Sequence, residues 1–277
     1  QSTLAKDIKK RDFQLFINSL SPRYSTSTIN LVVKAIRNLV KLAVSDHVIS
    51  ENFTTGIMQP KKTDRTIEYL NTEELSKLTR YITNNLNPEY RADYIILTAI
   101  YTGARLGEIL GLTWEDINFN FKTITINKAW NHTTKSISTT KNTSSNRTIP
   151  VNDELLSALK QLKVNHTQYL FLENHVSYSV IVNTRLRKLL TTCNIEKQSY
   201  HFHSLRHTHV AYLLANNIPL AVIAKRLGHA NTTTTANTYA YLIEEFEDKT
   251  NRDILNSLGV LNGVPTSKLS NTANNRK

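Results

Sequence analysis

Cysteine is almost absent from this chain of 277 residues, which contains only Cys193. A single cysteine permits no internal disulfide and suits a reducing cytoplasm. Long apolar runs are missing too: none approaches the roughly eighteen residues of a membrane span, and the N-terminus lacks a charged-then-apolar signal pattern. We therefore expect a cytoplasmic protein without a membrane segment.

Several catalytic motifs are also missing. No glycine-rich loop ends in Lys-Ser or Lys-Thr, so ATP and GTP are not implied, and no Gly-x-Ser-x-Gly turn supports a serine hydrolase. His203 and His207 lie one helical turn apart, but no Glu stands between them as in the zinc motif His-Glu-x-x-His. Arg206 would also put a fixed positive charge beside a metal. We expect neither a metal nor a cofactor.

The charge that is present is strongly positive. Lys and Arg total 34 against 22 Asp and Glu, which gives a net charge of +12 and a pI near 9.7. This balance favours a polyanionic partner, with nucleic acid as the first interpretation and an anionic membrane surface as the second. The hydrophobic content of 40% is normal for a globular protein, and the length allows two domains.

The N-terminal part is predicted to be a small helical domain over residues 1–60. Apolar residues recur at helical spacing over Thr3–Leu20 and Ser25–Val44, with breaker and capping residues between them. A polar, charged segment at 61–68 is typical of a linker. Because Asn71 can cap a new helix, we expect a second domain over 69–260, followed by a polar tail at 261–277.

The second domain has a mixed pattern that predicts an α+β fold, mainly helical with a small antiparallel sheet. Strands are expected at Lys122–Asn127 and Arg147–Val151, with a mobile basic hairpin between them. Helices are expected at Tyr94–Tyr101, Asp153–Val164, Tyr178–Leu190, Ser204–Asn216, Leu220–Leu227 and Glu244–Leu258. Gly103 permits a sharp turn, so Arg105 can project from a break between two helices.

Four separated motifs stand out in this domain. In chain order they are Thr102-Gly103-Ala104-Arg105-Leu106-Gly107-Glu108, Lys141 ahead of Ser145-Asn146-Arg147, His203-Ser204-Leu205-Arg206-His207, and Leu227-Gly228-His229 followed by Tyr239. Taken together and in this order, they resemble the tyrosine recombinase (phage integrase) family, and most of all the integrases of conjugative transposons and phages. The resemblance covers about residues 69–260, and the helical N-terminal unit resembles the core-binding domain of the family.

The resemblance implies site-specific recombination of DNA through a 3′-phosphotyrosine, for integration and excision of a mobile element. Tyr239 would attack the phosphodiester, while Arg105 and Arg206 would hold its non-bridging oxygens by charge-assisted hydrogen bonds. His203 would assist proton transfer at the nucleophile, His229 would donate a hydrogen bond to the phosphate, and Lys141 would protonate the leaving 5′-oxygen.

The resemblance also implies partners. The first is double-stranded DNA. The second is further copies of the chain, which form a tetramer on DNA and in which the helix at 244–258 docks on a neighbouring copy. The third is an excisionase or a host DNA-bending protein. Because the chain begins with Gln1, we expect that an upstream segment was removed, and the family suggests an arm-binding domain.

Three alternatives stay open at this point. A type IB topoisomerase shares the chemistry, although the small N-terminal unit and the Leu-Gly-His motif argue against it. A basic DNA-binding or architectural protein without catalysis is an alternative from another class. Within the site, Tyr241 is an alternative nucleophile, because Tyr239 follows His229 by one residue more than in many family members.

Overall fold

The computed structural model describes residues 4–58, 67–139, 145–165, 167–172, 178–240 and 242. Its contacts divide the chain into two units, residues 1–66 and 67–277, which we describe separately. Among the described residues, no helix is long and apolar enough to cross a membrane.

Unit 1 is a pair of helices with a small core. A 3-10 turn η1 (Ala5–Asp7) precedes α1 (Lys10–Leu20) and α2 (Thr26–Ser45). The single helix expected from residue 3 is therefore wrong in its first part: the Asp12 carboxylate accepts from the Lys9 backbone N–H at 3.0 Å, so a new helix begins there. Ser25 caps α2 by accepting from the Thr28 N–H. The core consists of Phe13, Ile17, Ile29, Val33 and Ile57.

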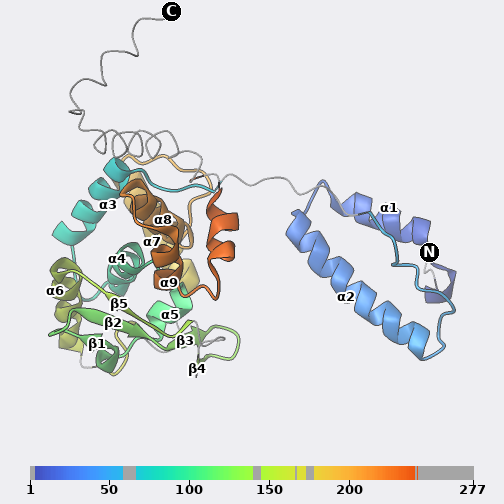
Figure 1. Ribbon diagram of the computed structural model, residues 1–277, viewed down its shortest axis with the longest axis horizontal. Helices are drawn as coiled ribbons and strands as arrows, with labels where there is room; N and C mark the ends of the chain where they lie inside the picture. Colours follow the sequence, from blue (N-terminus) through green and yellow to red (C-terminus); the bar gives the residue numbers. More distant parts are fainter. Residues whose placement is uncertain are drawn as a thin grey trace, which may run out of the picture. The chain divides into compact units, whose positions relative to one another are not determined.

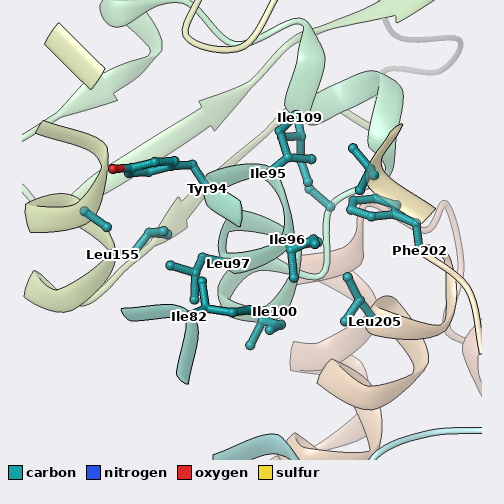
Figure 2. Close-up of a cluster of buried hydrophobic side chains, with 14 of the residues drawn as sticks. Ile82, Tyr94, Ile95, Ile96, Leu97, Ile100, Ile109, Leu155, Phe202 and Leu205 are labelled. Atoms are coloured by element: carbon teal, nitrogen blue, oxygen red, sulfur yellow. The ribbon is translucent and has the colours of Figure 1, made fainter. Parts of the chain in front are cut away.

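Unit 2 is built around one buried helix, α4 (Arg91–Thr102). It packs against α3 (Thr72–Asn84), α5 (Leu106–Leu110), α6 (Asp153–Gln161), α7 (Tyr178–Thr192) and α8 (Ser204–Ala215). Figure 2 shows the apolar side chains of α4 among residues of its neighbours, including Ile109, Leu155 and Leu205. A helix with apolar residues on every side must be covered all round, and this helix carries the first site motif at its C-terminus.

One charged side chain of α4 is buried and paired. Asp93 is 1% exposed and accepts both hydrogen bonds of a bidentate ion pair from Arg185 on α7, at 2.6 and 2.7 Å. The pair compensates the desolvation of the carboxylate and ties α7 to α4.

The expected antiparallel sheet is present. Strands β1 (Ile117–Asn118), β2 (Thr123–Ile126) and β5 (Arg147–Pro150) pair in the order β1-β2-β5, after a 3-10 turn η2 (Trp114–Asp116). Ile124 lies opposite Ile149 with both side chains buried, while Thr125 lies opposite Thr148 on the other face. This alternation is the period of two from which the strands were predicted.

The hairpin expected between these strands forms a second, separate sheet. The polar stretch after residue 127 forms β3 (Lys128–Asn131) and β4 (Ser136–Thr139), a separate antiparallel pair. Gly107 explains part of its position, because a Cβ there would lie 2.8 Å from the Trp130 carbonyl oxygen, so only glycine lets β3 lie this close to α5. The expected hairpin between the two strands is therefore present over β3 and β4, although it begins at Lys128, before the predicted stretch.

The remaining described elements follow α6 and α7. They are the 3-10 turn η4 (Leu162–Asn165), α9 (Leu220–Leu227) and helical residues 232–240. Helices α8 and α9 lie side by side, as Figure 1 shows within this unit. The expected α+β fold, mainly helical with small antiparallel sheets, is confirmed. The predicted helix at 244–258 and the tail lie outside the described residues.

Candidate active site

The first site motif lies at the break between α4 and α5, as the sequence predicts. Gly103 ends α4 in the left-handed region with φ of 66°, and Arg105 is the N-cap of α5. The Arg105 side chain is 42% exposed, and its Nη1 donates to Glu108 Oε1 at 2.9 Å. Arg105 is thus held at one end by a carboxylate while much of its guanidinium stays open to a ligand.

Arg206 on α8 is a buried cation of the site. Its Nη1 donates to the Gly103 carbonyl at 2.6 Å, and its Nη2 donates to the Leu227 carbonyl at 2.8 Å. These two bonds join the helix break, α8 and the end of α9. Burial, and next the charge of Arg105, lower the pKa of Arg206 to about 10, so the side chain remains a cation at neutral pH.

His229 follows a left-handed Gly228 that ends α9. Its Nε2 lies 3.0 Å from Arg206 Nη2, and its Nδ1 lies 2.7 Å from the Oγ1 of buried Thr235. An arginine can only donate, so His229 Nε2 accepts and Nδ1 carries the proton. Burial, followed by the charge of Arg206, lowers the pKa of His229 to about 4, so the ring is neutral at pH 7.

Tyr239 lies inside the protein rather than on a free loop. It is 1% exposed and packs with Val210, Ile223 and Leu227. Its Oη lies 2.9 Å from His207 Nδ1. Burial raises the pKa of Tyr239 to about 12, against the lowering effect of the charges of Arg206 and Arg105. The phenol is therefore protonated in this state of the protein.

The histidines of α8 form a row beside this tyrosine. The ring centroids of His203 and His207 are 5.2 Å apart with an edge-to-face angle of 87°, and those of His207 and Tyr239 are 5.5 Å apart. Desolvation, and then the charge of Arg206, lower the pKa of His203. His203 was predicted to act at the nucleophile, yet it is His207 whose ring hydrogen-bonds with the Tyr239 hydroxyl.

A buried ion pair joins β5 to α5 next to the site. Arg147, the first residue of β5, donates from Nη2 to Glu108 Oε2 at 2.8 Å, and each side chain is 5% exposed. Its Nε also donates to the Arg226 carbonyl at 2.7 Å, two residues before Gly228. Burial alone would raise the pKa of Glu108, but the hydrogen bond and charge of Arg147 and the contacts with Arg105 hold it below its ordinary value.

The structure thus brings four of the six predicted residues, Arg105, Arg206, His229 and Tyr239, into one connected site, with His203 beside it. Lys141 lies outside the described residues. Sequence reasoning assigned no part to Glu108, Arg147, His207 or Thr235. Glu108, Arg147 and His207 stand inside the quoted motifs, so a signal existed for these three, whereas Thr235 stands in a run of threonines with nothing to distinguish it. Among the described residues, no group of three or more His, Cys, Asp or Glu side chains could hold a metal ion.

Two guanidinium groups and a tyrosine hydroxyl at one site define a class of protein, an enzyme that transfers a phosphoryl group through tyrosine. The model of the Phage integrase family matches residues 68–245. The chain belongs to this family, and its activity is that of a tyrosine site-specific recombinase of a mobile element acting on DNA. This decides against the topoisomerase and the non-catalytic alternatives.

Individual relatives agree. The chain is 29% identical to the integrase of Staphylococcus phage L54a, over 89% of this chain and 79% of the relative. It is 28% identical to a XerC-like tyrosine recombinase of Caldanaerobacter subterraneus subsp. tengcongensis, over 91% of this chain and 71% of the relative. The Tn1549 transposon integrase, solved in complex with transposon right end DNA, has a similar fold with a TM-score of 0.71 at 20% identity, covering 86% of this chain and 82% of that one.

Proposed function

We propose that Tyr239 is the nucleophile with which this recombinase cuts and rejoins duplex DNA during integration and excision of its element. The Tyr239 Oη would form a bond to phosphorus while the bond from phosphorus to the 5′-oxygen breaks, leaving a 3′-phosphotyrosine and a 5′-hydroxyl. The observation that supports this most is the Tyr239 hydroxyl beside His207, in a site where the charges of Arg206 and Arg105 lower the pKa of the phenol against the effect of burial.

Arg105 and Arg206 act on the charge that develops on the non-bridging oxygens. The transition state for attack on a phosphodiester carries more negative charge there than the substrate does, so fixed donors aimed at these oxygens lower the barrier. The Arg206 side chain need not move when DNA binds, because two backbone carbonyls already hold its guanidinium in place. Arg105 is the more open of the two and meets the phosphate from the α5 side.

The other three predicted residues complete the proposed chemistry. Lys141 protonates the leaving 5′-oxygen, and His203 assists proton transfer near the nucleophile. His229 donates a hydrogen bond to the phosphate. Since its Nε2 accepts from Arg206 in the DNA-free protein, this donation requires the phosphate to draw a proton onto that nitrogen. Binding of the negative phosphate favours this protonation.

The nucleophile is tested with a labelled DNA duplex that contains a nick near the cleavage point, so that the released strand diffuses away and the adduct accumulates. We expect the Tyr239→Phe variant to form no adduct. Tyr212→Phe is the matched control, because this tyrosine is 41% exposed and lies on the same unit. An adduct that persists in Tyr239→Phe and disappears in Tyr241→Phe would transfer the role to the alternative tyrosine.

We propose that the enzyme acts as a tetramer on DNA. Residues 1–60 act as a core-binding domain that clamps the duplex together with residues 69–260, and four copies join two DNA sites. The helix at 244–258 docks on a neighbouring copy, and an excisionase or host DNA-bending protein assists in the bacterial cytoplasm. The size of the complex on paired sites, measured by light scattering with and without residues 244–277, tests this: four copies are expected for the full chain and fewer for the shortened one.

A further inference from the structure

His207 has no part in the roles assigned so far, although it makes the closest polar contact with the nucleophile. It lies on α8 directly after Arg206, with its Nδ1 at 2.9 Å from Tyr239 Oη and the two rings edge to face at 62°. A general base that acts directly lies within about 2.6–3.2 Å of the atom whose proton it removes. His207 meets this requirement before DNA binds.

The groups around His207 keep its ring neutral, so that a ring nitrogen has a free lone pair. Burial comes first, and then the charges of His203, Arg206 and His201, and together they lower its pKa to about 4. The ring is therefore neutral at pH 7, and in the tautomer with Nε2 protonated the Nδ1 lone pair points at the phenol. Bulk water is a poor competitor, because Tyr239 is only 1% exposed.

We propose that His207 is a catalytic residue whose Nδ1 takes the proton from Tyr239 Oη during attack, an inference that rests on Tyr239 being the nucleophile. As the Oη–P bond forms and the P–O5′ bond breaks, the Oη–H proton moves to Nδ1, and the leaving 5′-oxygen takes its proton from Lys141. In rejoining, the 5′-hydroxyl gives its proton back to Lys141 while protonated His207 returns its own to the leaving phenolate. Each strand transfer thus leaves the enzyme unchanged.

The surroundings make this transfer depend on DNA. An imidazolium at position 207 would stand beside Arg206 and next to His203, which disfavours it in the free protein. A phosphodiester bound by Arg105 and Arg206 brings negative charge to the same place and offsets that repulsion. The nucleophile therefore stays a protonated phenol until a phosphate is bound, which protects the free enzyme from reacting with other electrophiles.

His207→Asn separates proton transfer from hydrogen bonding. The Asn side-chain oxygen lies about where Nδ1 lies and still accepts a hydrogen bond from Tyr239, but an amide cannot take the proton. We expect single-turnover cleavage of the nicked duplex to fall about 10²–10⁴-fold, the usual contribution of a general base, with DNA affinity unchanged. The rate of the variant should rise with pH, because hydroxide must then deprotonate the phenol, and the wild type should depend on pH much less.

A duplex with sulfur in place of the bridging 5′-oxygen identifies which proton transfer is lost. A thiolate leaves without being protonated, so this substrate should restore cleavage by Lys141→Ala but not by His207→Asn. His201→Asn is the matched control: it makes the same change in the same row of rings, but at a histidine that bonds with Ser199 and Ser204 instead. We expect it to cleave at the wild-type rate.

The outcomes distinguish this inference from the proposed function. If Tyr239→Phe forms no adduct while His207→Asn cleaves at the wild-type rate and pH profile, the nucleophile stands and the role of His207 is refuted. Recovery of His207→Asn with the sulfur substrate would refute it equally. Should His207→Asn fail to bind DNA, His207→Ala is measured with added imidazole, where restored cleavage supports the role and its absence overturns it.

Discussion

Replacing Arg147 with methionine should destabilise unit 2 far more than a single surface charge does. The change removes one partner of a buried ion pair and leaves the Glu108 carboxylate, 5% exposed, with Arg105 alone. Breaking a buried pair from one side costs about 3–5 kcal/mol, because the remaining charge loses compensation for its desolvation. The lost hydrogen bond to the Arg226 carbonyl adds to this cost.

The loss should depend on pH in a defined direction. In the native protein the pKa of Glu108 is held below its ordinary value, so the pair contributes stability above the unfolded pKa of about 4.3 and this contribution fades as pH falls through the folded pKa. In Arg147→Met the hydrogen bond and charge of Arg147 no longer lower the pKa of Glu108, so this pKa is higher than in the wild type, and protonation of the carboxyl at acid pH reduces the cost of its burial. The difference between variant and wild type is therefore largest near pH 7 and shrinks toward pH 4.

Urea unfolding followed by tryptophan fluorescence measures this directly. Both tryptophans, Trp114 and Trp130, belong to unit 2, so the signal reports that unit within the full chain. Lys122→Met is the control, since its pair with Asp153 has side chains 53% and 70% exposed and should cost less than about 1 kcal/mol. Equal losses for the two variants, or an Arg147→Met loss that does not change with pH, would refute the reasoning.

Three further predictions follow from the site and the charge. Arg206→Lys should lower the rate of adduct formation by about 10²-fold or more while the protein still folds. An ammonium cannot reproduce the planar guanidinium that the Gly103 and Leu227 carbonyls hold in place. An unchanged rate in a single-turnover assay would contradict this. Gly103→Ala should destabilise unit 2 by about 1–3 kcal/mol in the urea assay. The backbone φ is +66°, and the new Cβ would lie 2.7 Å from His209 Cδ2. An unchanged free energy of unfolding would contradict this. If the protein contacts six to ten phosphates, its DNA affinity should fall about 10³–10⁵-fold between 50 and 200 mM salt, measured by fluorescence anisotropy. Binding that does not change with salt would contradict a clamp made by the basic surface.

Much of the fold was predictable from local patterns. The alternation around Ile124 and Ile149 predicted the strands, and Gly103 predicted the helix break that presents Arg105, which the structure confirms. A hairpin was expected between these strands, but not that β3 and β4 would form a sheet of their own, because β4 is polar and mostly exposed and carries no apolar alternation. The place of this hairpin against α5 depends on Gly107, a contact made across the fold.

The hydrogen bonds that join different elements of the site could not be predicted either, because they too connect residues that are far apart in the sequence. Glu108 and Arg147 are 39 residues apart, and His207 and Tyr239 are 32 apart, so neither pair shares a helix or a hairpin. Residue types and motif order identified which side chains belong to the site. Only the packing of α8 against α4 and α9 determines that His207, rather than His203, meets the phenol.

The central claim is that this enzyme attacks DNA with Tyr239. Digesting the trapped adduct and sequencing the peptides by mass spectrometry locates the phosphotyrosine directly. The account predicts a nucleotide remnant on Tyr239 in the wild type and none anywhere in Tyr239→Phe. A remnant on Tyr241, or on any other residue, would contradict it.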